Sequence, residues 1–183
     1  MNSSVAGGAG TGSDGYVVAV VGATGLVGRT MISILEERNF PVRTLLPLAA
    51  SAGGRSVSFR GAQVPVQEAT PDAFVGVDIA LFSAGADVSL KLAPEAAARG
   101  CTVVDNSSAW RMDPTVPLVV SQVNPDALSR HHGIIANPNC STMQLAPLLK
   151  ALQDEAGLRR VVVATYQAVS GAGAESVDDL VQQ

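Results

Sequence analysis

The stretch that decides the expected fold is residues 16–28, Tyr16-Val17-Val18-Ala19-Val20-Val21-Gly22-Ala23-Thr24-Gly25-Leu26-Val27-Gly28. A continuous apolar run of this kind is typical of a parallel strand that is covered on both faces. The residues that follow predict a helix, whose apolar side is expected to carry Leu26, Val27, Met31, Ile34 and Leu35. The stretch therefore predicts a buried strand, a glycine-rich turn and a helix, in that order.

The three glycines of this turn have different expected roles. Gly22 permits the tight turn, Gly25 lets a phosphate approach the backbone, and Gly28 lets the helix pack closely on the strand. The backbone N–H groups at the helix start then form an anion site. An ordinary strand-to-helix turn could carry the same glycines, but the strand before and the helix after favour dinucleotide binding.

Strands and helices alternate along the rest of the chain. Further strands are expected at residues 42–48, 57–59, 64–66, 77–83, 102–105, 118–120, 134–136 and 161–166. Helices are expected through Leu90, Ala93, Ala96 and Ala97, and from Cys140 onward. This alternation predicts an α/β fold with a Rossmann-like, doubly wound and mostly parallel sheet.

Ligands on such a sheet bind beyond the carboxyl ends of its strands. Four pieces of sequence follow expected strands: the glycine turn, Ser83-Ala84-Gly85, Asp105-Asn106-Ser107-Ser108 and Asn137-Pro138-Asn139-Cys140. We therefore expect these pieces to lie together and to form one site.

Cys140 stands between the expected strand 134–136 and a helix that carries Met143, Leu145, Leu148, Leu149 and Leu152. A cysteine at a helix N-terminus faces unpaired backbone N–H groups and the positive end of the helix dipole, which favour the nucleophilic thiolate. The neighbouring Asn, Ser and Thr side chains can cap the helix. A buried, unreactive cysteine is the alternative interpretation, and it is the one we adopt for Cys101, at the start of strand 102–105.

Composition limits the classes of protein to which the chain can belong. Its 183 residues, 47% of them hydrophobic and 15% charged, suffice for one well-buried domain and the start of another. The net charge of −4 argues against nucleic acid or an anionic membrane as the main partner. The two cysteines form no Cys-x-x-Cys pair and the histidines no metal-ligand cluster, so we expect no metal site and a reducing compartment.

Residues 1–15 consist mainly of Gly, Ser, Ala and Thr, without Lys or Arg. We expect a disordered leader that is neither a signal peptide nor a transmembrane helix. Later apolar runs are too short to cross a bilayer. Together these features predict a cytoplasmic protein.

The end of the second strand bears on the choice of nucleotide. A site that prefers NAD usually places Asp or Glu there to hold the ribose hydroxyls. This chain instead reads Leu48-Ala49-Ala50-Ser51-Ala52-Gly53-Gly54-Arg55, without a carboxylate. A small hydroxyl residue and a nearby arginine suit the 2′-phosphate of NADP, and a flexible loop with an incidental arginine is the alternative.

Together, these motifs resemble those of the aspartate-semialdehyde dehydrogenase family. The resemblance covers residues 17–183 and is carried by six motifs in the family's order, at residues 22–28, 78–85, 105–111, 116–120, 137–142 and 165–173. The related N-acetyl-glutamyl-phosphate reductases typically have a glycine before the cysteine, where this chain has Asn139. That difference favours an aspartyl substrate.

The resemblance implies roles for individual residues. Cys140 corresponds to the nucleophile that forms an acyl-thioester, Gln167 to the residue that orients the substrate, and Arg111 to the phosphate-binding arginine. Asn139 is assigned to the substrate site with them. Taken alone, Arg111 could equally be a solvated loop arginine, and Gln167 a surface amide. The expected nucleotide contacts are Gly22, Thr24, Gly25, Leu26, Val27, Gly28, Ser51, Ala52, Arg55, Ser83, Ala84, Gly85, Ser170 and Gly171.

The resemblance also implies a reaction, the NADP-dependent reductive dephosphorylation of 4-phospho-L-aspartate to L-aspartate 4-semialdehyde. This step belongs to the synthesis of lysine and diaminopimelate, methionine, threonine and isoleucine, and the implied assembly is a homodimer. Two alternatives stay open: a reductase of another acyl phosphate, such as N-acetyl-glutamyl phosphate, and a catalytically silent nucleotide-binding module.

Members of that family are longer than this chain, and their second half supplies a catalytic histidine and an arginine for the substrate carboxylate. Residues 178–183 are expected to stop in mid-helix without a cap. We therefore expect a fragment that is inactive alone, with the leader at 1–15, an NADP-binding domain at 16–139 and the truncated start of an α+β catalytic and dimerisation domain at 140–183. His131 and His132 are expected to be solvated, and neither corresponds to the family's base.

Overall fold

The structure is a computed structural model that describes residues 15–183, so the expected leader lies, apart from Gly15, outside the described residues. The strands are β1 (Tyr16–Val21), β2 (Val42–Ala49), β3 (Ser56–Phe59), β4 (Ala62–Pro65), β5 (Gln67–Glu68), β6 (Ile79–Phe82), β7 (Thr102–Asp105) and β8 (Ile134–Ala136). The α-helices are α1 (Leu26–Glu37), α2 (Ala86–Ala98), α3 (Cys140–Ala156) and α4 (Ala174–Gln182). Short 3-10 helices cover Pro71–Phe74, Pro125–Arg130 and Val169–Ala172.

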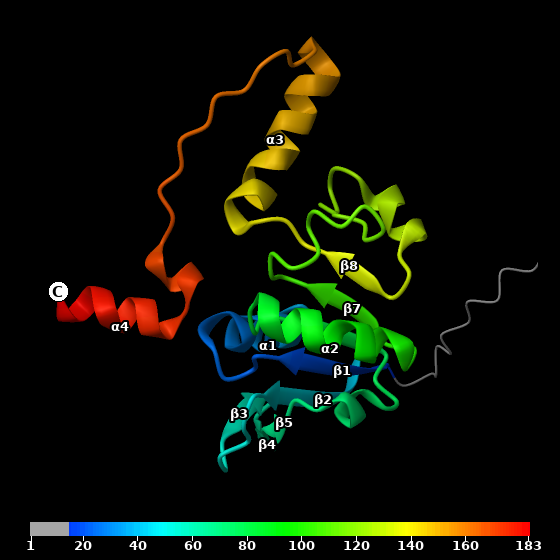
Figure 1. Cartoon of the computed structure of the whole chain (residues 1–183), viewed down its shortest axis with the longest axis vertical. Coiled ribbons are helices and arrows are strands. Elements are labelled where there is room, and N and C mark those ends of the chain that lie inside the picture. Colours follow the sequence, from blue (N-terminus) through cyan, green and yellow to red (C-terminus); the bar gives the residue numbers. More distant parts are fainter. Residues whose placement is uncertain (1–14) are drawn as a thin grey trace, which may run out of the picture.

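Six strands form one parallel sheet in the order β5-β2-β1-β6-β7-β8, with α1 and α2 on opposite faces (Figure 1). Alternate side chains of β1 serve the two faces, as the pleat of a strand requires. Ala19 and Val21 pack in the same core as α2, whereas Val18 and Val20 pack with Ile32 of α1. The predicted doubly wound α/β fold is therefore confirmed.

The glycine turn has the geometry expected for two of its three glycines. Gly22 has a φ of +87°, and a Cβ there would lie 2.9 Å from the backbone of Ser83. A Cβ on Gly28 would lie 2.2 Å from the carbonyl oxygen of Gly22. Side chains at either position would separate β1 from α1 or from the end of β6, so these glycines permit the close packing beside the sheet edge.

The buried stripes of α1 and α2 differ in part from the prediction. In α1 the buried residues are Gly28 and Ile32, whereas Leu26, Val27 and Ile34 are exposed. Because Gly28 has no side chain, the helix packs on the glycine turn through this residue. The side chains of Leu26 and Val27 then lie on the exposed side of the helix. In α2 the expected Ala93 and Ala96 are buried together with Ser89 and Leu92, but Leu90 is exposed.

A small hairpin extends from the sheet. β3 and β4 pair antiparallel, and Arg60 and Gly61 between them both have positive φ values, as a tight hairpin turn requires. The two expected strands are confirmed. No pattern in the sequence predicts the two-residue β5, which pairs with the end of β2.

The prediction of a strand at residues 118–120 is wrong. Only one bridge forms there, between Leu118 and Ala136 of β8. The bridge uses the Pro117 carbonyl and the Val119 N–H, and its continuation in either direction would need an N–H from Pro117 or Pro138, which proline lacks. On the opposite edge of the segment, Asn124 Oδ1 accepts from the Val120 N–H at 2.8 Å and Nδ2 donates to the Leu118 carbonyl at 2.9 Å.

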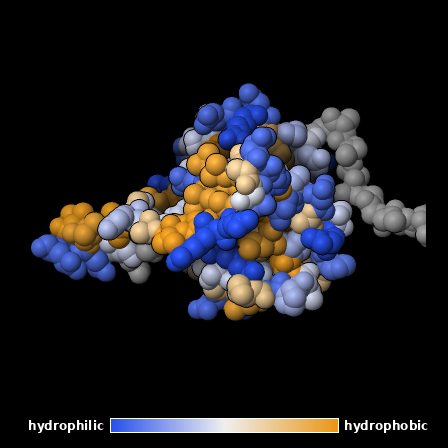
Figure 2. Space-filling model, turned by 90° about the horizontal axis from the view of Figure 1, so that it is seen from above, coloured by the Kyte–Doolittle hydropathy of each residue, from blue (hydrophilic) through white to orange (hydrophobic). Residues whose placement is uncertain are grey.

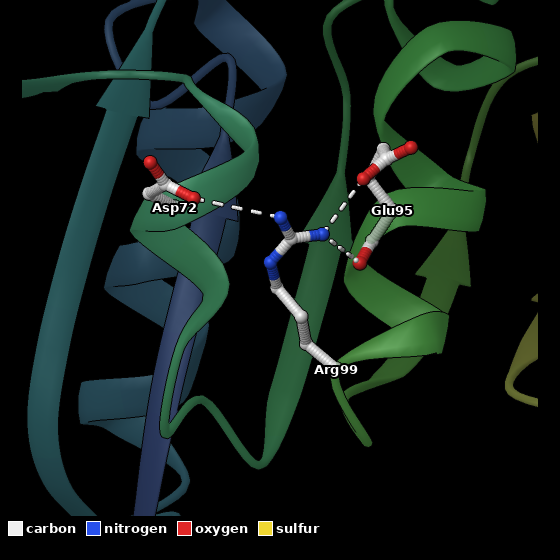
Figure 3. A network of polar contacts seen from close by, with 3 residues as sticks. All are labelled: Asp72, Glu95 and Arg99. Atoms are coloured by element: carbon white, nitrogen blue, oxygen red, sulfur yellow. Dashed lines mark hydrogen bonds and ion pairs between the residues drawn. The ribbon is translucent and has the colours of Figure 1, made fainter.

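An ion-pair network joins α2 to the 3-10 helix at residues 71–74 (Figure 3). Arg99 donates to the Glu95 carboxylate at 2.7 Å and to the Glu95 carbonyl at 2.9 Å, and it reaches Asp72 at 3.5 Å. The hydrogen bond to Glu95, and the charges of both carboxylates, raise the pKa of Arg99. The network fixes the C-terminal end of α2, which is the end opposite the N-cap residue Gly85.

The segment after β8 is organised differently from the sheet. α3 has no buried residue, and the expected apolar side of this helix is open, with Leu148 and Leu152 exposed. The strand expected at residues 161–166 is wrong, because this segment is extended but unpaired and Tyr166 is fully exposed. It runs apart from the sheet toward α4, and Figure 2 shows hydrophobic surface at the α3 end of the molecule and on α4. A strand needs a partner, and the described residues supply none here.

Candidate active site

A cleft of about 850 Å³ lies at the carboxyl ends of β1, β2 and β6. β1 connects to β2 on one side and has β6 on the other, so the cleft lies at the switch point where such sheets bind ligands. Twelve of the expected nucleotide contacts line it: Gly22, Thr24, Gly25, Leu26, Val27, Ser51, Arg55, Ser83, Ala84, Gly85, Ser170 and Gly171. The remaining two, Gly28 and Ala52, are not in its lining. Gly28 packs behind the turn, and the carbonyl of Ala52 accepts from Arg55.

Arg55 connects the loop after β2 to the glycine turn. Its Nη1 donates to Thr24 Oγ1 at 3.3 Å, and its Nη2 donates to the carbonyl of Ser51. The guanidinium therefore lies at the rim of the cleft, between two segments that are 31 residues apart in sequence. A cation held in this place can bind an anionic group that enters from the end of β2.

The cleft also contains residues that the sequence did not reveal. Glu68 and Thr70 come from β5 and the residues after it, and Lys91 comes from α2. Glu68 pairs with Ala49, so the cleft has a carboxylate beside the end of β2 after all, but on the neighbouring strand. Only the pairing of β5 with β2 brings it there, and two residues of sequence carry no strand signal.

The thiol of Cys140 lies at the first residue of α3 and is exposed. Asn139 caps this helix, because its Oδ1 accepts from the Ser141 N–H at 3.0 Å. Cys140 Sγ lies 3.8 Å from Gln167 Oε1 and 4.0 Å from Asn139 Oδ1. Gln167 Nε2 in turn donates to Asn139 Oδ1 at 3.4 Å. The structure thus brings together three of the four expected substrate-site residues, across 27 residues of sequence.

A hollow of about 520 Å³ lies beside this thiol. Its lining includes Cys140 and Gln144 from α3 and Gln167 from the extended segment. Ser170 and Gly171 line both this hollow and the cleft. A molecule in the cleft and one at the thiol would therefore meet at these two residues.

Arg111 is the fourth expected substrate-site residue, and it lies outside both linings. The half-buried side chain donates from Nε to the Asn137 carbonyl at 2.8 Å and from Nη2 to the Asn106 carbonyl at 3.1 Å. It therefore bridges the loops that follow β7 and β8. Asn137 stands two residues before the helix cap Asn139, so Arg111 supports the loop that leads to the thiol.

The second cysteine and the two histidines do not line the hollow. Cys101 is buried, and its burial together with the charge of Asp78 raises the pKa of its thiol to about 12. This confirms the core assignment. His132 is exposed as expected, whereas His131 is half-buried and accepts at Nδ1 from the Gly133 N–H at 3.2 Å.

No helix among residues 15–183 has the length and apolar character needed to span a membrane. The same residues contain no group of three or more His, Cys, Asp or Glu side chains placed to hold a metal ion.

The parallel sheet, the glycine turn and the cleft at the switch point define a Rossmann-like α/β protein with an exposed thiol beside its cleft. The chain belongs to the semialdehyde dehydrogenase family. The family model "Semialdehyde dehydrogenase, NAD binding domain" matches residues 17–131, and "Semialdehyde dehydrogenase, dimerisation domain" matches residues 149–183.

Individual relatives agree with this assignment. The aspartate-semialdehyde dehydrogenase of Aquifex aeolicus is 54% identical over 92% of this chain and 51% of its own length. The structure of aspartate semialdehyde dehydrogenase II from Vibrio cholerae, complexed with ASA, is 47% identical with a TM-score of 0.88, over 92% of this chain and 51% of that one. Aspartate semialdehyde dehydrogenase with NADP from Candida albicans is 29% identical with a TM-score of 0.65, over 78% of this chain and 48% of that one. This chain thus spans about half the length of these relatives.

Proposed function

We propose that this chain supplies the nucleotide cleft and the nucleophile of an NADP-dependent aspartate-semialdehyde dehydrogenase. The observation that carries the proposal is the position of Cys140. The thiol lies at a capped helix start within reach of Gln167, and its hollow shares Ser170 and Gly171 with the nucleotide cleft. A pure binding module has no use for an exposed thiol oriented by two amides. The domain boundary is then at residues 139–140, where the sheet region ends and the helix with the nucleophile begins.

The cleft suits a dinucleotide. A Cβ at Gly22 would clash with Ser83, and the glycine there leaves the backbone of the turn uncovered by a side chain. The N–H groups of Leu26 and Val27, at the start of α1, lack helical partners. Such a cradle accepts a pyrophosphate. Arg55 and Ser51 at the end of β2 would hold the 2′-phosphate of NADP, and this is the group that the Candida relative's cofactor carries.

In the proposed reaction, Cys140 Sγ attacks the acyl carbon of 4-phospho-L-aspartate. The bond from that carbon to the phosphate oxygen breaks, phosphate leaves with the electron pair, and a thioester remains on Cys140. Gln167 orients the acyl group without competing as a base, because an amide is neutral. When bound, NADPH supplies the hydride that reduces the thioester. The carbon–sulfur bond then breaks, which releases L-aspartate 4-semialdehyde and returns the thiolate.

A proton must move to and from oxygen and sulfur in this sequence. The described residues that line the hollow include no His, Asp, Glu or Lys. We therefore expect the acid–base group to come from the part of the relatives' length that this chain does not cover. The 183-residue chain alone should bind nucleotide but show no turnover.

The assembly and the setting of the enzyme belong to the same proposal. We expect a homodimer built through the region that matches the family's dimerisation domain, where Val162 and Leu180 are exposed. The enzyme would act in the cytoplasm, where a free nucleophilic thiol stays reduced. The reaction would serve the synthesis of lysine and diaminopimelate, methionine, threonine and isoleucine.

The test is a chimera that joins residues 1–183 in frame to the second half of the Vibrio cholerae relative. We expect it to reduce NADP in the presence of L-aspartate 4-semialdehyde and phosphate. Cys140→Ser should lower kcat by about a thousandfold or more, because an alcohol is a far weaker nucleophile than a thiolate. Cys101→Ser is the matched control and should keep the rate.

Three outcomes would contradict parts of the proposal. Nucleotide binding without turnover in the chimera would favour a silent binding module. Turnover with N-acetyl-glutamate semialdehyde instead would favour the related reductase. Activity that survives Cys140→Ser would exclude the thioester mechanism.

A further inference from the structure

A buried serine on α2 is held by the one tryptophan of the chain. The Trp110 indole Nε1–H donates to Ser89 Oγ at 2.9 Å, and Ser89 is fully buried. A hydroxyl on the buried face of a helix costs free energy unless it is hydrogen-bonded. Its neighbours on that face are Leu92, Ala93 and Ala96, so the hydrogen bond to Trp110 is the feature that accounts for a serine here.

Ser89 lies in the part of α2 that forms a wall of the nucleotide cleft. Gly85, Val88, Lys91 and Leu92 all line the cleft, and the Ser89 N–H donates to the Gly85 carbonyl at 3.1 Å. Trp110 itself packs against the core that contains this helix. The indole therefore contacts the back of the cleft wall.

On its other side, Trp110 is joined directly to Arg111. The loop that carries both starts at the buried carboxylate of Asp105, which accepts from the Ser107 hydroxyl at 2.6 Å and from the Ser107 N–H at 3.2 Å. Ser107 Oγ then accepts from the Ala109 N–H at 3.1 Å. The loop is thus fixed at its start by Asp105 and at its end by Trp110.

Arg111 has two donors committed to the carbonyls of Asn137 and Asn106. Its place relative to the Cys140 loop therefore depends on a short backbone path from the Trp110 anchor. A shift of Trp110 would move the guanidinium and the Asn137 carbonyl together.

We propose that Trp110, anchored by Ser89, is a positioning residue for Arg111, and that it links the phosphate-binding arginine to the helix that walls the nucleotide cleft. The inference rests on the proposed function together with the role that the resemblance implies for Arg111, binding of the substrate's phosphate. Its consequence is that binding in the cleft and binding of phosphate are coupled through a single hydrogen bond between side chains.

The main experiment compares two variants in the chimera that remove the same hydrogen bond from opposite ends. Ser89→Ala and Trp110→Phe should each raise the KM for phosphate by about fivefold, the size expected when one neutral hydrogen bond is lost, while kcat changes little. The double variant should be no worse than either single variant, because the bond can be lost only once. Ser89→Thr keeps the hydroxyl and should restore the KM.

Ala96→Gly is the matched control. It destabilises α2 two turns from Ser89 on the same buried face but leaves the Trp110 bond in place. It should lower the melting temperature without changing the KM for phosphate. An unchanged KM in Ser89→Ala and Trp110→Phe, or two effects that simply add in the double variant, would overturn the inference.

A second measurement uses the 183-residue chain, in which tryptophan emission comes from Trp110 alone. Saturating NADP should change this emission, and the change should be smaller in Ser89→Ala. Equal changes in both proteins would also overturn the inference. A parent chimera that turns over without needing phosphate would instead refute the proposed function, and the role of Trp110 with it.

Discussion

The sheet region and the segment after β8 have similar apolar sequences but opposite degrees of burial. Residues 16–136 enclose two large buried clusters, one on each face of β1. Residues 140–156 form a helix with five apolar side chains at the positions expected for a buried face, yet none of its residues is buried. An apolar pattern therefore specifies which face of an element can be buried. Whether that face is buried depends on a partner from elsewhere in the chain.

The two cysteines illustrate the same difference. Cys101 follows α2 and is enclosed by the sheet and helix, whereas Cys140 begins a helix that leaves the sheet and remains exposed. The sheet region thus provides a rigid cleft, and the segment after it presents the reactive group. If this division is correct, changes in the two regions should differ in their effects on reactivity, stability and ligand binding.

The largest effect should be the difference in alkylation rate between Cys140 and Cys101. Because burial raises the pKa of Cys101 from 9.0 to about 12, its thiolate fraction at pH 8 falls about a thousandfold below that of an ordinary thiol. Burial also blocks the reagent. Iodoacetamide should therefore modify Cys140 and spare Cys101, as peptide mass spectrometry can measure. In denaturant both should react at comparable rates, and comparable rates in the folded protein would contradict the division.

Truncation of a large apolar side chain should lower the free energy of unfolding much more in the sheet region than in the segment after β8. Phe82 is almost fully buried and stacks on Phe74 at 5.8 Å, so Phe82→Ala should cost about 3–5 kcal/mol of unfolding free energy. Leu148 on α3 is 66% exposed, and Leu148→Ala should change that free energy by less than about 0.5 kcal/mol. Denaturant titration measures both. A similar loss for Leu148→Ala would mean that α3 is packed in solution in the isolated chain.

These contrasts show which parts of the fold a single sequence can predict. The strands at residues 102–105 and 134–136 were predicted with their observed bounds, because short apolar runs before polar loops are local signals. The prediction of a strand at 118–120 was not correct, because Pro117 and Pro138 limit its pairing with β8 to one bridge. The strand at 161–166 was not correct either, because strand pairing is a nonlocal property.

The site divides in the same way. The sequence located the cleft through the glycine turn and strand ends, since the fold rule places those ends together. It could not reveal Glu68, which reaches the cleft only through the pairing of β5 with β2. It also did not reveal that Arg111 is bonded to two backbone carbonyls behind the thiol loop, because side-chain direction depends on contacts that are distant in sequence.

An intermediate effect is expected in nucleotide preference, which tests the rigid cleft. NADPH should bind more tightly than NADH. Arg55→Ala should lower the affinity for NADPH by about tenfold, because a charge-assisted contact to the 2′-phosphate is lost. The affinity for NADH should hardly change. Glu68→Gln should widen the difference in affinity between the two nucleotides, because it removes a carboxylate that can hold the ribose hydroxyls of NADH. Arg38→Ala, at the C-terminal end of α1 and outside the cleft, removes the same charge and should leave both affinities unchanged. Equal titrations for the two nucleotides in the parent chain would contradict the 2′-phosphate assignment.

The smallest effect concerns a loop between β7 and β8 that is fixed by side chains instead of strand pairing. The Thr115 hydroxyl and N–H both donate to Asp113 Oδ1, at 2.7 and 2.8 Å, and these bonds lower the pKa of Asp113. A carboxyl whose folded pKa is lowered stabilises the fold above its unfolded pKa, and this contribution is lost as the pH falls through the lowered folded value. Thr115→Val removes the hydroxyl donor, so it should raise the pKa of Asp113 toward 3.8 in an NMR titration. The stability difference between the parent and Thr115→Val should be present at neutral pH and shrink as the pH falls below that value. A stability difference that stays constant at every acidic pH would mean that Thr115 stabilises the loop without the Asp113 carboxylate. Hydrogen bonds to that carboxylate would then not explain how a loop without a strand partner keeps its conformation.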